Sequence, residues 1–441
     1  MIALRRILGS LVAATALAAV AACAPTSTRD DLVRVPEDAA TLTEAAERVA
    51  PGGMILIAAG TYEEQVLIDT ADVTVRGADR NATIIDGGGT RAYGIVVTAD
   101  GVRVENLTIT GATFYGLLFT GLHDETGPSA PTANGYERWD PAEFPPLKRF
   151  LVDHVTAHGN GLYGVYAFNA RHGEIRDSYA SGSADSGFYV GQCEQCDILV
   201  TGNVAERNAV GFENANASDS VVVVGNRFAG NRVGMTLLSS HQEAFTPQRG
   251  NVIVGNLISD NVQADSPAQA DGGFAIGVGI SGGQDNVLVR NRITGNPRAG
   301  VVLANMEDLP AAGNRFTGNV LDEDGAPDAG VSIANVSAAR TPATGNCAEG
   351  ALVVTLPVTL AEELAAACAG STAAQTAASA ALPGPEAPPG VSFLRVAAPR
   401  PQPNLPLRSA YAPLPASVTM PDLERFDVPP ADLFANRAGT R

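Results

Sequence analysis

Two tyrosines and a glutamate occupy the same position in three successive repeats of the chain. Each repeat has a glycine, an apolar residue, a variable residue and usually a second apolar residue, and the variable residue is Tyr166, Tyr189 or Glu213. Side chains alternate along a strand, so this position faces outward when its two neighbours face a core. We expect two stacked rings beside a carboxylate, either as a platform for a ligand or as a ladder that only stabilises a sheet.

Acid–base groups lie on both sides of the first tyrosine in the sequence. Asp153, His154 and His158 precede it, and His172 follows it. A carboxyl and an imidazole can act as acid and base when they flank one bond. We therefore take Asp153, His154 and Glu213 as catalytic candidates and expect the histidines to converge on the same zone. The alternative is that Asp153 and His154 are turn residues whose hydrogen bonds are satisfied locally.

Two insertions interrupt the repeats near this zone. The first, from 123 to 147, carries the only tryptophan, Trp139, and the second, from 240 to 250, carries Glu243. Function in repeat proteins usually resides in such loops. An aromatic floor surrounded by carboxylates and imidazoles suits a saccharide, because ring faces stack and hydroxyls form hydrogen bonds. The substrate-binding candidates are Tyr166, Tyr189, Trp139, His158 and His172.

The glycine pattern recurs nine times, and most steps between successive copies are 22 to 24 residues. The outward positions are Leu118, Tyr166, Tyr189, Glu213, Thr236, Gly279, Val302 and Ser332. Asparagines five residues apart recur with similar spacing, at Asn203/Asn208, Asn226/Asn231, Asn256/Asn261, Asn291/Asn296 and Asn314/Asn319. Stacked asparagines can hydrogen-bond from coil to coil. A coil of this length with three short strands predicts an all-β fold, a right-handed parallel β-helix, over 33–340.

These repeats resemble those of the pectin-lyase-like superfamily of right-handed parallel β-helices, which occur in carbohydrate-binding proteins and sugar hydrolases. The segment from Thr41 to Val66, with a short capping helix expected from Leu42 to Val49, is similar to that superfamily's opening segment. The resemblance implies a polysaccharide lyase, a glycoside hydrolase, an epimerase or a non-catalytic protein. Gly-His-Gly with paired aspartates, Asp-Phe-Ile-Phe-Gly and Asp-Pro-His-Asp, which mark catalytic members, are missing. The sequence therefore assigns no reaction.

Residues 1–22 predict an export signal, because Arg5 and Arg6 are followed by an apolar stretch rich in small residues. The stretch ends in Val20-Ala21-Ala22-Cys23, which resembles the lipobox of bacterial lipoproteins. The resemblance implies that Cys23 is lipidated and anchors the chain to a membrane outside the cytoplasm. The alternative is ordinary cleavage beside an incidental cysteine.

The segments that flank the repeats differ from them in composition. Residues 23–32 are short and polar and predict a tether. Residues 341–369 predict a C-terminal cap with a short helix from 360 to 367. Residues 370–441 are rich in alanine and proline and predict an extended or disordered tail, or a strap along the solenoid.

Four cysteines remain beside Cys23 and predict two disulfides in an extracytoplasmic protein. Proximity in the sequence favours Cys193–Cys196 and Cys347–Cys368. A redox or metal site at Cys193-Glu-Gln-Cys196 would need a second pair of closely spaced cysteines or a thioredoxin-like context, and the sequence has neither. We expect no metal and no cofactor.

The net charge of −18, with Lys148 as the only lysine, argues against a nucleic acid partner. The expected partners are a polysaccharide and, through the lipid anchor, a membrane. The competing hypothesis is a non-catalytic surface scaffold that presents the loops of the solenoid to another protein.

Overall fold

The computed structural model describes residues 29–124, 127–128, 139–270, 272–321, 330–350, 354–406, 408 and 411–439. The export signal, Cys23 and residues 129–138 of the first insertion lie outside this part of the chain. No helix within the described residues is long and apolar enough to cross a membrane.

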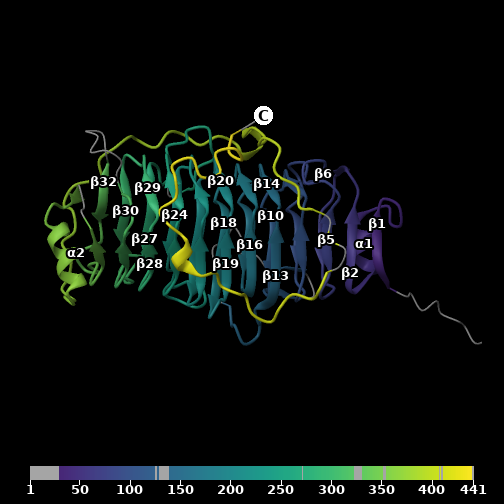
Figure 1. Cartoon of the computed structure of the whole chain (residues 1–441), viewed down its shortest axis with the longest axis horizontal. Coiled ribbons are helices and arrows are strands. Elements are labelled where there is room, and N and C mark those ends of the chain that lie inside the picture. Colours follow the sequence, from purple (N-terminus) through teal and green to yellow (C-terminus); the bar gives the residue numbers. More distant parts are fainter. Residues whose placement is uncertain are drawn as a thin grey trace, which may run out of the picture.

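Short strands of the described residues form three long parallel sheets that wind around one axis as a parallel β-helix (Figure 1). Sheet A contains β1 (Asp30–Val35), β2 (Val49–Ile57), β5 (Thr74–Gly77), β8 (Arg103–Glu105), β13 (Leu147–Asp153), β16 (Ala170–Arg176), β19 (Ile198–Thr201), β22 (Val221–Val224), β25 (Val252–Val254), β28 (Val287–Val289), β31 (Arg315–Thr317) and β33 (Cys347–Glu349). Sheet B contains β3 (Gly60–Tyr62), β6 (Thr83–Asp86), β9 (Thr108–Thr110), β14 (Thr156–His158), β17 (Tyr179–Ser181), β20 (Val204–Glu206), β23 (Arg227–Phe228), β26 (Leu257–Ser259) and β29 (Arg292–Thr294).

Sheet C carries the outward column of the glycine repeat. It contains β4 (Val66–Ile68), β7 (Tyr93–Val97), β10 (Tyr115–Thr120), β15 (Tyr163–Phe168), β18 (Ser186–Glu194), β21 (Val210–Ser218), β24 (Val233–Leu238), β27 (Ile276–Ser281), β30 (Ala299–Ala304), β32 (Val331–Asn335) and β34 (Thr355–Leu356). A small antiparallel hairpin, β11 (His123–Asp124) with β12 (Gly127–Pro128), lies in the first insertion.

One apolar core runs along the axis between the three sheets. In β15, Val165 and Ala167 point into this core and Tyr166 points away from it, as the repeat pattern predicts. Phe188 and Val190 do the same on either side of Tyr189. The alternation of the repeat therefore assigns these inward and outward positions correctly.

The paired asparagines form two buried ladders across successive coils. In the first ladder, the Asn226 Nδ2 donates to Asn256 Oδ1 at 2.9 Å, and Asn256 Nδ2 donates to Asn291 Oδ1 at 2.9 Å. In the second, Asn208 Nδ2 donates to Asn231 Oδ1 at 3.0 Å. Each of these amides also donates to a backbone carbonyl of the preceding coil, so the ladders satisfy polar atoms that no water reaches.

Helices close both ends of the coiled body (Figure 1). Helix α1 (Leu42–Arg48) begins after Thr41, whose hydroxyl accepts from the Glu44 N–H at 3.0 Å. Helix α2 (Leu360–Cys368) buries Leu360 and Leu364 against the last coil. Sheets A and C continue past residue 340 into β33 and β34, which lie in the segment predicted as the cap.

The described residues of 370–439, here called the strap, run back along the body in a largely extended conformation (yellow-green to yellow in Figure 1). They include two short 3-10 helices, η1 (Phe393–Arg395) and η2 (Leu423–Arg425). Arginines of the body donate to backbone carbonyls of the strap. The pairs are Arg298 with Pro385, Arg232 with Pro388 and Pro389, Arg80 with Pro403, Arg76 with Leu405, Arg103 with Ala412, Arg290 with Leu423 and Phe426, Arg292 with Pro429, and Arg227 with Leu433. Extended proline-rich chain has no internal partners for its carbonyls, and these side chains supply them.

Candidate functional site

The outward tyrosines of sheet C contact one another within and between coils. Tyr163 and Tyr166 of one strand stack, whereas Tyr166 and Tyr189 of neighbouring coils meet edge to face at 66°. Tyr166 pairs in register with Tyr189, and Tyr189 pairs with Glu213. The rings of Tyr163 and Tyr166 are nearly parallel with centroids 4.2 Å apart, and those of Tyr166 and Tyr189 are 4.6 Å apart. Tyr115 stacks on Tyr166 from the preceding coil. These residues form the centre of an aromatic cluster on the outward face of sheet C.

Both insertions cover this aromatic cluster. Trp139 and Phe144 from the first insertion pack against it. The ring of Trp139 lies 6.3 Å from that of Phe168 and 5.8 Å from that of Phe245 in the second insertion. As a result Tyr166 and Tyr189 are each only 2% exposed. The tyrosines are therefore a buried layer and do not form an open platform for a ligand.

The register of sheet C corrects one member of the outward column. Val302 pairs with Ala334, and Gly300 is opposite Ser332. The repeat glycine at 330 therefore does not keep the spacing of the earlier coils, and Ser332 is not an outward neighbour of Val302.

Three carboxyls gather at the edge of the aromatic cluster, in what we call the acid cluster: Asp185, Glu213 and Glu243. Glu213 comes from β21, Asp185 from the turn before β18, and Glu243 from the second insertion. Gln269 Nε2 donates to Asp185 Oδ1 at 2.5 Å and lies 3.5 Å from Glu213 Oε2. Gln192 Nε2 donates to the Glu243 carboxylate. Glu213 and Glu243 are buried, and Asp185 is half-buried at the surface of the acid cluster.

Burial and mutual repulsion change the proton affinity of the acid cluster. Burial raises the pKa of Glu213 well above its usual range, and the charges of Asp185 and Glu243 and a hydrogen bond with Asp185 raise it further. Burial also raises the pKa of Glu243 to about 7, although the hydrogen bond from Gln192 opposes this. Carboxyls held this close cannot all ionise, so the acid cluster keeps a proton at neutral pH and can act as an acid.

The sequence identified Glu213 by its place in the repeat but did not connect it with Asp185 or Glu243. Asp185 lies just before the repeat glycine Gly187, in a turn whose path the repeat does not specify. Glu243 lies in an insertion of the kind that carries function in solenoids, which was the only signal for it.

Asp153 and His154 do not reach the acid cluster, because they lie at the end of β13 in sheet A. The Asp153 carboxylate accepts from His154 Nδ1 at 2.6 Å, from Arg176 at 2.7 Å and from Arg408 of the strap at 3.4 Å. Burial acts to raise the pKa of Asp153, but the hydrogen bonds from His154 and Arg176 lower it below its usual value. Asp177 lies close enough to His154 and Asp153 to share a metal ion, but the Asp153 oxygens already bind two arginines.

His158 and His172 lie on two further faces, so the predicted convergence of the histidines with the tyrosines is wrong. His158 belongs to sheet B and lines a cavity of about 270 Å³ beneath the strap. His172 belongs to sheet A and lines a second cavity of about 260 Å³, also walled by the strap. Its Nδ1 is 2.9 Å from the Asp197 carboxylate. Each coil of the solenoid has three outward faces, one for each sheet, so residues that are a few positions apart in the sequence can lie on different sides of the solenoid.

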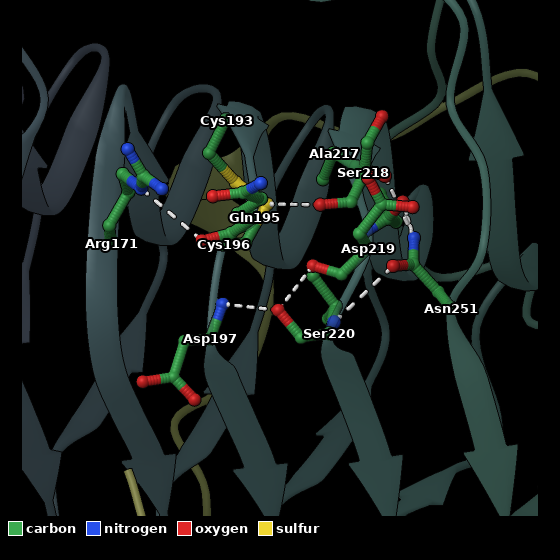
Figure 2. The surroundings of a disulfide bond; sticks show 12 residues. Arg171, Cys193, Gln195, Cys196, Asp197, Ala217, Ser218, Asp219, Ser220 and Asn251 are labelled. Atoms are coloured by element: carbon green, nitrogen blue, oxygen red, sulfur yellow. Dashed lines mark hydrogen bonds between the residues drawn. A yellow bond between two sulfur atoms is a disulfide. The ribbon is translucent and has the colours of Figure 1, made fainter. Parts of the chain in front are cut away.

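Both predicted disulfides are present, and one of them directly follows Gln192, whose side chain binds Glu243. Cys193 and Cys196 are fully buried in the central core at the corner where sheet C leads into sheet A. Figure 2 shows this turn, in which the Gln195 carbonyl accepts from Arg171 Nε at 3.2 Å. Cys347–Cys368 joins β33 to α2. Burial of both sulfurs in the core fits the structural interpretation of the Cys193-Glu-Gln-Cys196 motif.

A family model for the right-handed beta helix region matches residues 73–246. A search among curated proteins finds no match. Three solved structures with similar folds are a pectate lyase, Pel9A, the A-module of the mannuronan C-5 epimerase AlgE4 from Azotobacter vinelandii, and an alginate lyase from Paenibacillus sp. str. FPU-7. Each is 15% identical to this chain.

The first has a TM-score of 0.39 and covers 71% of each chain. The epimerase module has a TM-score of 0.34, and the match covers 69% of this chain and 90% of the module. The alginate lyase has a TM-score of 0.35, and the match covers 66% of this chain and 94% of the lyase. The family match and the three parallel sheets confirm the predicted fold class, and they identify the chain as an all-β, right-handed parallel β-helix protein.

Proposed function

We propose that this β-helix is a lipid-anchored, extracytoplasmic protein that binds a polysaccharide on the outward face of sheet C and uses the acid cluster to donate a proton to it. The observation that carries the proposal is the position of Asp185, Glu213 and Glu243 at the edge of the aromatic cluster, on one face of the solenoid. Aromatic rings and carboxyls are the groups that saccharide sites use to stack ring faces and bind hydroxyls.

The chemistry of the acid cluster suits cleavage of a glycosidic bond. A leaving glycosidic oxygen must gain a proton, whether water or elimination breaks the bond. Burial and two carboxyl neighbours disfavour the charged form of Glu213 and raise its pKa, which favours its role as a proton donor. Asp185, at the half-buried edge, is the member that a chain lying on the surface reaches first. Glu213 is therefore the acid in this proposal, and Asp185 binds the substrate beside it.

Substitution of Glu213 tests this function. Glu213→Gln keeps the shape and removes the proton, so release of oligosaccharides from a panel of polysaccharides should fall by about 100-fold or more, while binding persists. The matched control is Glu194→Gln, because Glu194 lies at the exposed end of β18; it should change neither property. Full turnover in Glu213→Gln would refute the acid role, and failure of the wild-type chain to bind any polysaccharide would refute the proposed function.

The anchor is tested separately by Cys23→Ala. Without a lipidated cysteine the chain should leave the membrane fraction and enter the soluble extracytoplasmic fraction. A variant that stays with the membrane contradicts lipid anchoring and leaves the polysaccharide site untouched.

Burial of the tyrosines favours a second candidate, a non-catalytic scaffold in which the aromatic cluster only stabilises the sheet. Tyr166→Leu distinguishes the two functions, because the ring stacks on Tyr163 and meets Tyr189 edge to face. A loss of several degrees in melting temperature with unchanged polysaccharide binding supports the scaffold. Weakened binding in a variant that melts at the wild-type temperature supports the saccharide site.

A further inference from the structure

The cavity that contains His158 is separate from the proposed polysaccharide site, because it lies on sheet B. Its floor consists of two outward columns of that sheet. Thr108 pairs with Thr156 in the first column, and in the second Thr110 lies between Asp86 and His158. The wall opposite is the strap at Ala398, Pro399 and Arg400.

The first column presents a hydrogen-bond acceptor beside a donor. The Thr108 hydroxyl donates to the Arg80 carbonyl at 2.6 Å, so its oxygen keeps lone pairs for another donor. One rung away, Thr156 Oγ1 accepts from Arg80 Nε at 2.8 Å, so its own O–H can be donated. Arg80 is fully buried and fixes both orientations. A ligand hydroxyl, which both donates and accepts, matches this pair.

The second column adds a carboxylate, a hydroxyl and an imidazole, and Arg400 on the opposite wall offsets the charge of the carboxylate. Asp86 Oδ1 accepts from the Gly88 N–H at 2.7 Å, and Thr110 Oγ1 lies 3.3 Å from His158 Nδ1. Arg80 is the cation beneath the floor, but its guanidinium already donates to Thr156 and to backbone carbonyls, including that of Val155 at 2.8 Å. At the rim the exposed Arg400 faces a floor that contains the Asp86 carboxylate.

The strap wall is held in place by specific bonds. Asn81 Nδ2 donates to the Gln402 carbonyl at 2.9 Å, and the Gln402 N–H donates to Asn81 Oδ1 at 2.7 Å. The Arg400 N–H donates to the Gly439 carbonyl at 3.1 Å. The floor of the cavity is therefore rigid. The strap wall is fixed both to the body, through Asn81, and to another part of the strap, through Gly439.

We propose that this cavity binds one neutral, hydroxyl-rich ring, such as a single sugar unit or a cyclic polyol, between sheet B and the strap. Its volume of about 270 Å³ lies just below the range in which drug-sized ligands bind, which begins at about 300 Å³. The cavity thus accepts a small ring and excludes a longer compact ligand. It is a second site on a face that the polysaccharide proposal does not use.

Binding of D-glucose, D-galactose and myo-inositol to the full chain tests the assignment, with D-glucuronate as the charged comparison. At least one neutral probe should bind, measured by ligand-detected NMR, and should slow hydrogen exchange at the Arg400 amide. Thr110→Val removes one hydroxyl at nearly constant shape and should weaken binding about 5-fold, the equivalent of one hydrogen bond. His158→Phe replaces a polar side chain of the floor with an apolar one and should weaken binding of the probe further.

The matched control is Thr419→Val, the same change in the strap-walled cavity on sheet A; binding should not change. Glu213→Gln should also bind normally, because Glu213 lies on sheet C. The proposal is overturned if no neutral probe binds, if Thr110→Val and His158→Phe both bind as wild type, or if glucuronate binds more tightly than every neutral probe. Loss of binding in Glu213→Gln also overturns it, since the probes would then occupy the sheet C site.

Discussion

The coiled body and the strap satisfy their backbone polar groups in opposite ways. In the body, equivalent residues of successive coils bind each other, as when Asn226 binds Asn256. In the strap, carbonyls without internal partners accept from arginines that belong to other parts of the chain, as when Leu405 accepts from Arg76 at 2.7 Å. In the body the arrangement repeats, so each coil supports the next. The strap is instead held by a series of separate attachments. The comparison predicts that a substitution in the body destabilises several coils together, whereas a substitution in the strap loosens only the attachment that it removes.

The largest expected effect comes from the interior of an asparagine ladder. Asn256→Ala removes an amide that donates to Val223, Val254 and Asn291 and accepts from Asn226. Several buried groups lose their partners, at about 1–3 kcal/mol each, so we expect a loss of roughly 4 kcal/mol in the free energy of unfolding. Chemical denaturation followed by circular dichroism measures it.

The matched control for the ladder is Asn319→Ala, at its half-buried end, where the amide accepts from Asn291 and donates to Leu288. Its cost should be about half as large, because fewer buried groups lose partners. Equal losses in the two variants would contradict support from coil to coil.

A pH change should affect the acid cluster on sheet C and Asp153 on sheet A in opposite directions. Folded Glu243 keeps its proton up to about pH 7, whereas an unfolded glutamate releases it near 4.5. The native state therefore binds more protons between these values, and the free energy of unfolding should fall by roughly 3 kcal/mol as pH rises through this range. Glu243→Gln should remove the part of the fall that Glu243 causes, while Glu213, whose pKa is also raised, still lowers stability as pH rises. Denaturation at pH 5 and pH 8 measures the difference, and an unchanged pH dependence would show that Glu243 is not responsible.

Asp153, which binds Arg408 of the strap, has the reverse dependence. Its pKa is lowered in the folded chain, so its contribution is present above the ordinary pKa of an aspartate and disappears as pH falls through the folded value. Asp153→Asn should flatten the stability profile only on this acidic side. A change in the Asp153→Asn profile above pH 5 would contradict the assignment.

The smallest effect is expected at a single strap attachment. Arg290 donates to the Phe426 carbonyl at 2.7 Å and to the Leu423 carbonyl at 2.8 Å. Arg290→Ala should speed hydrogen exchange of the Phe426 amide about 10-fold while leaving exchange in the body unchanged. The control, Arg315→Ala, removes an exposed ion pair with Glu349 inside the body and should leave the strap as it is. Loosening of the whole strap in Arg290→Ala would mean that its attachments act together.

The body could be predicted from the sequence because each coil repeats the same inward and outward pattern. The positions of Tyr166, Tyr189 and Glu213 on one face follow from that period, and the structure confirms their register. Burial of the tyrosines could not be predicted, since it depends on where two non-repeating insertions fold. The same reason hides Glu243. The faces of His158 and His172 depend instead on where each short strand turns into the next sheet, which the glycine repeat does not specify.

The composition of residues 370–441 is consistent with an extended tail, a disordered tail or a strap along the solenoid, and does not distinguish among them. An alanine- and proline-rich segment has no period that indicates a partner, and its partners are arginines scattered singly through the coils. Arg80 illustrates the difficulty, because it is fully buried although its sequence context is a polar turn. Its burial requires the Pro403 carbonyl, more than 300 residues later.

The long reach of the strap also determines an order of assembly. The arginines that bind it are distributed from Arg76 to Arg298, and all of them precede the strap in the sequence. Each coil can form on its neighbour with short loops, whereas the bond from Arg76 to Leu405 closes a loop of 329 residues. The strap therefore docks only on coils that already exist. While the strap is undocked, the two cavities that it walls are open surfaces, so both cavities depend on its docking.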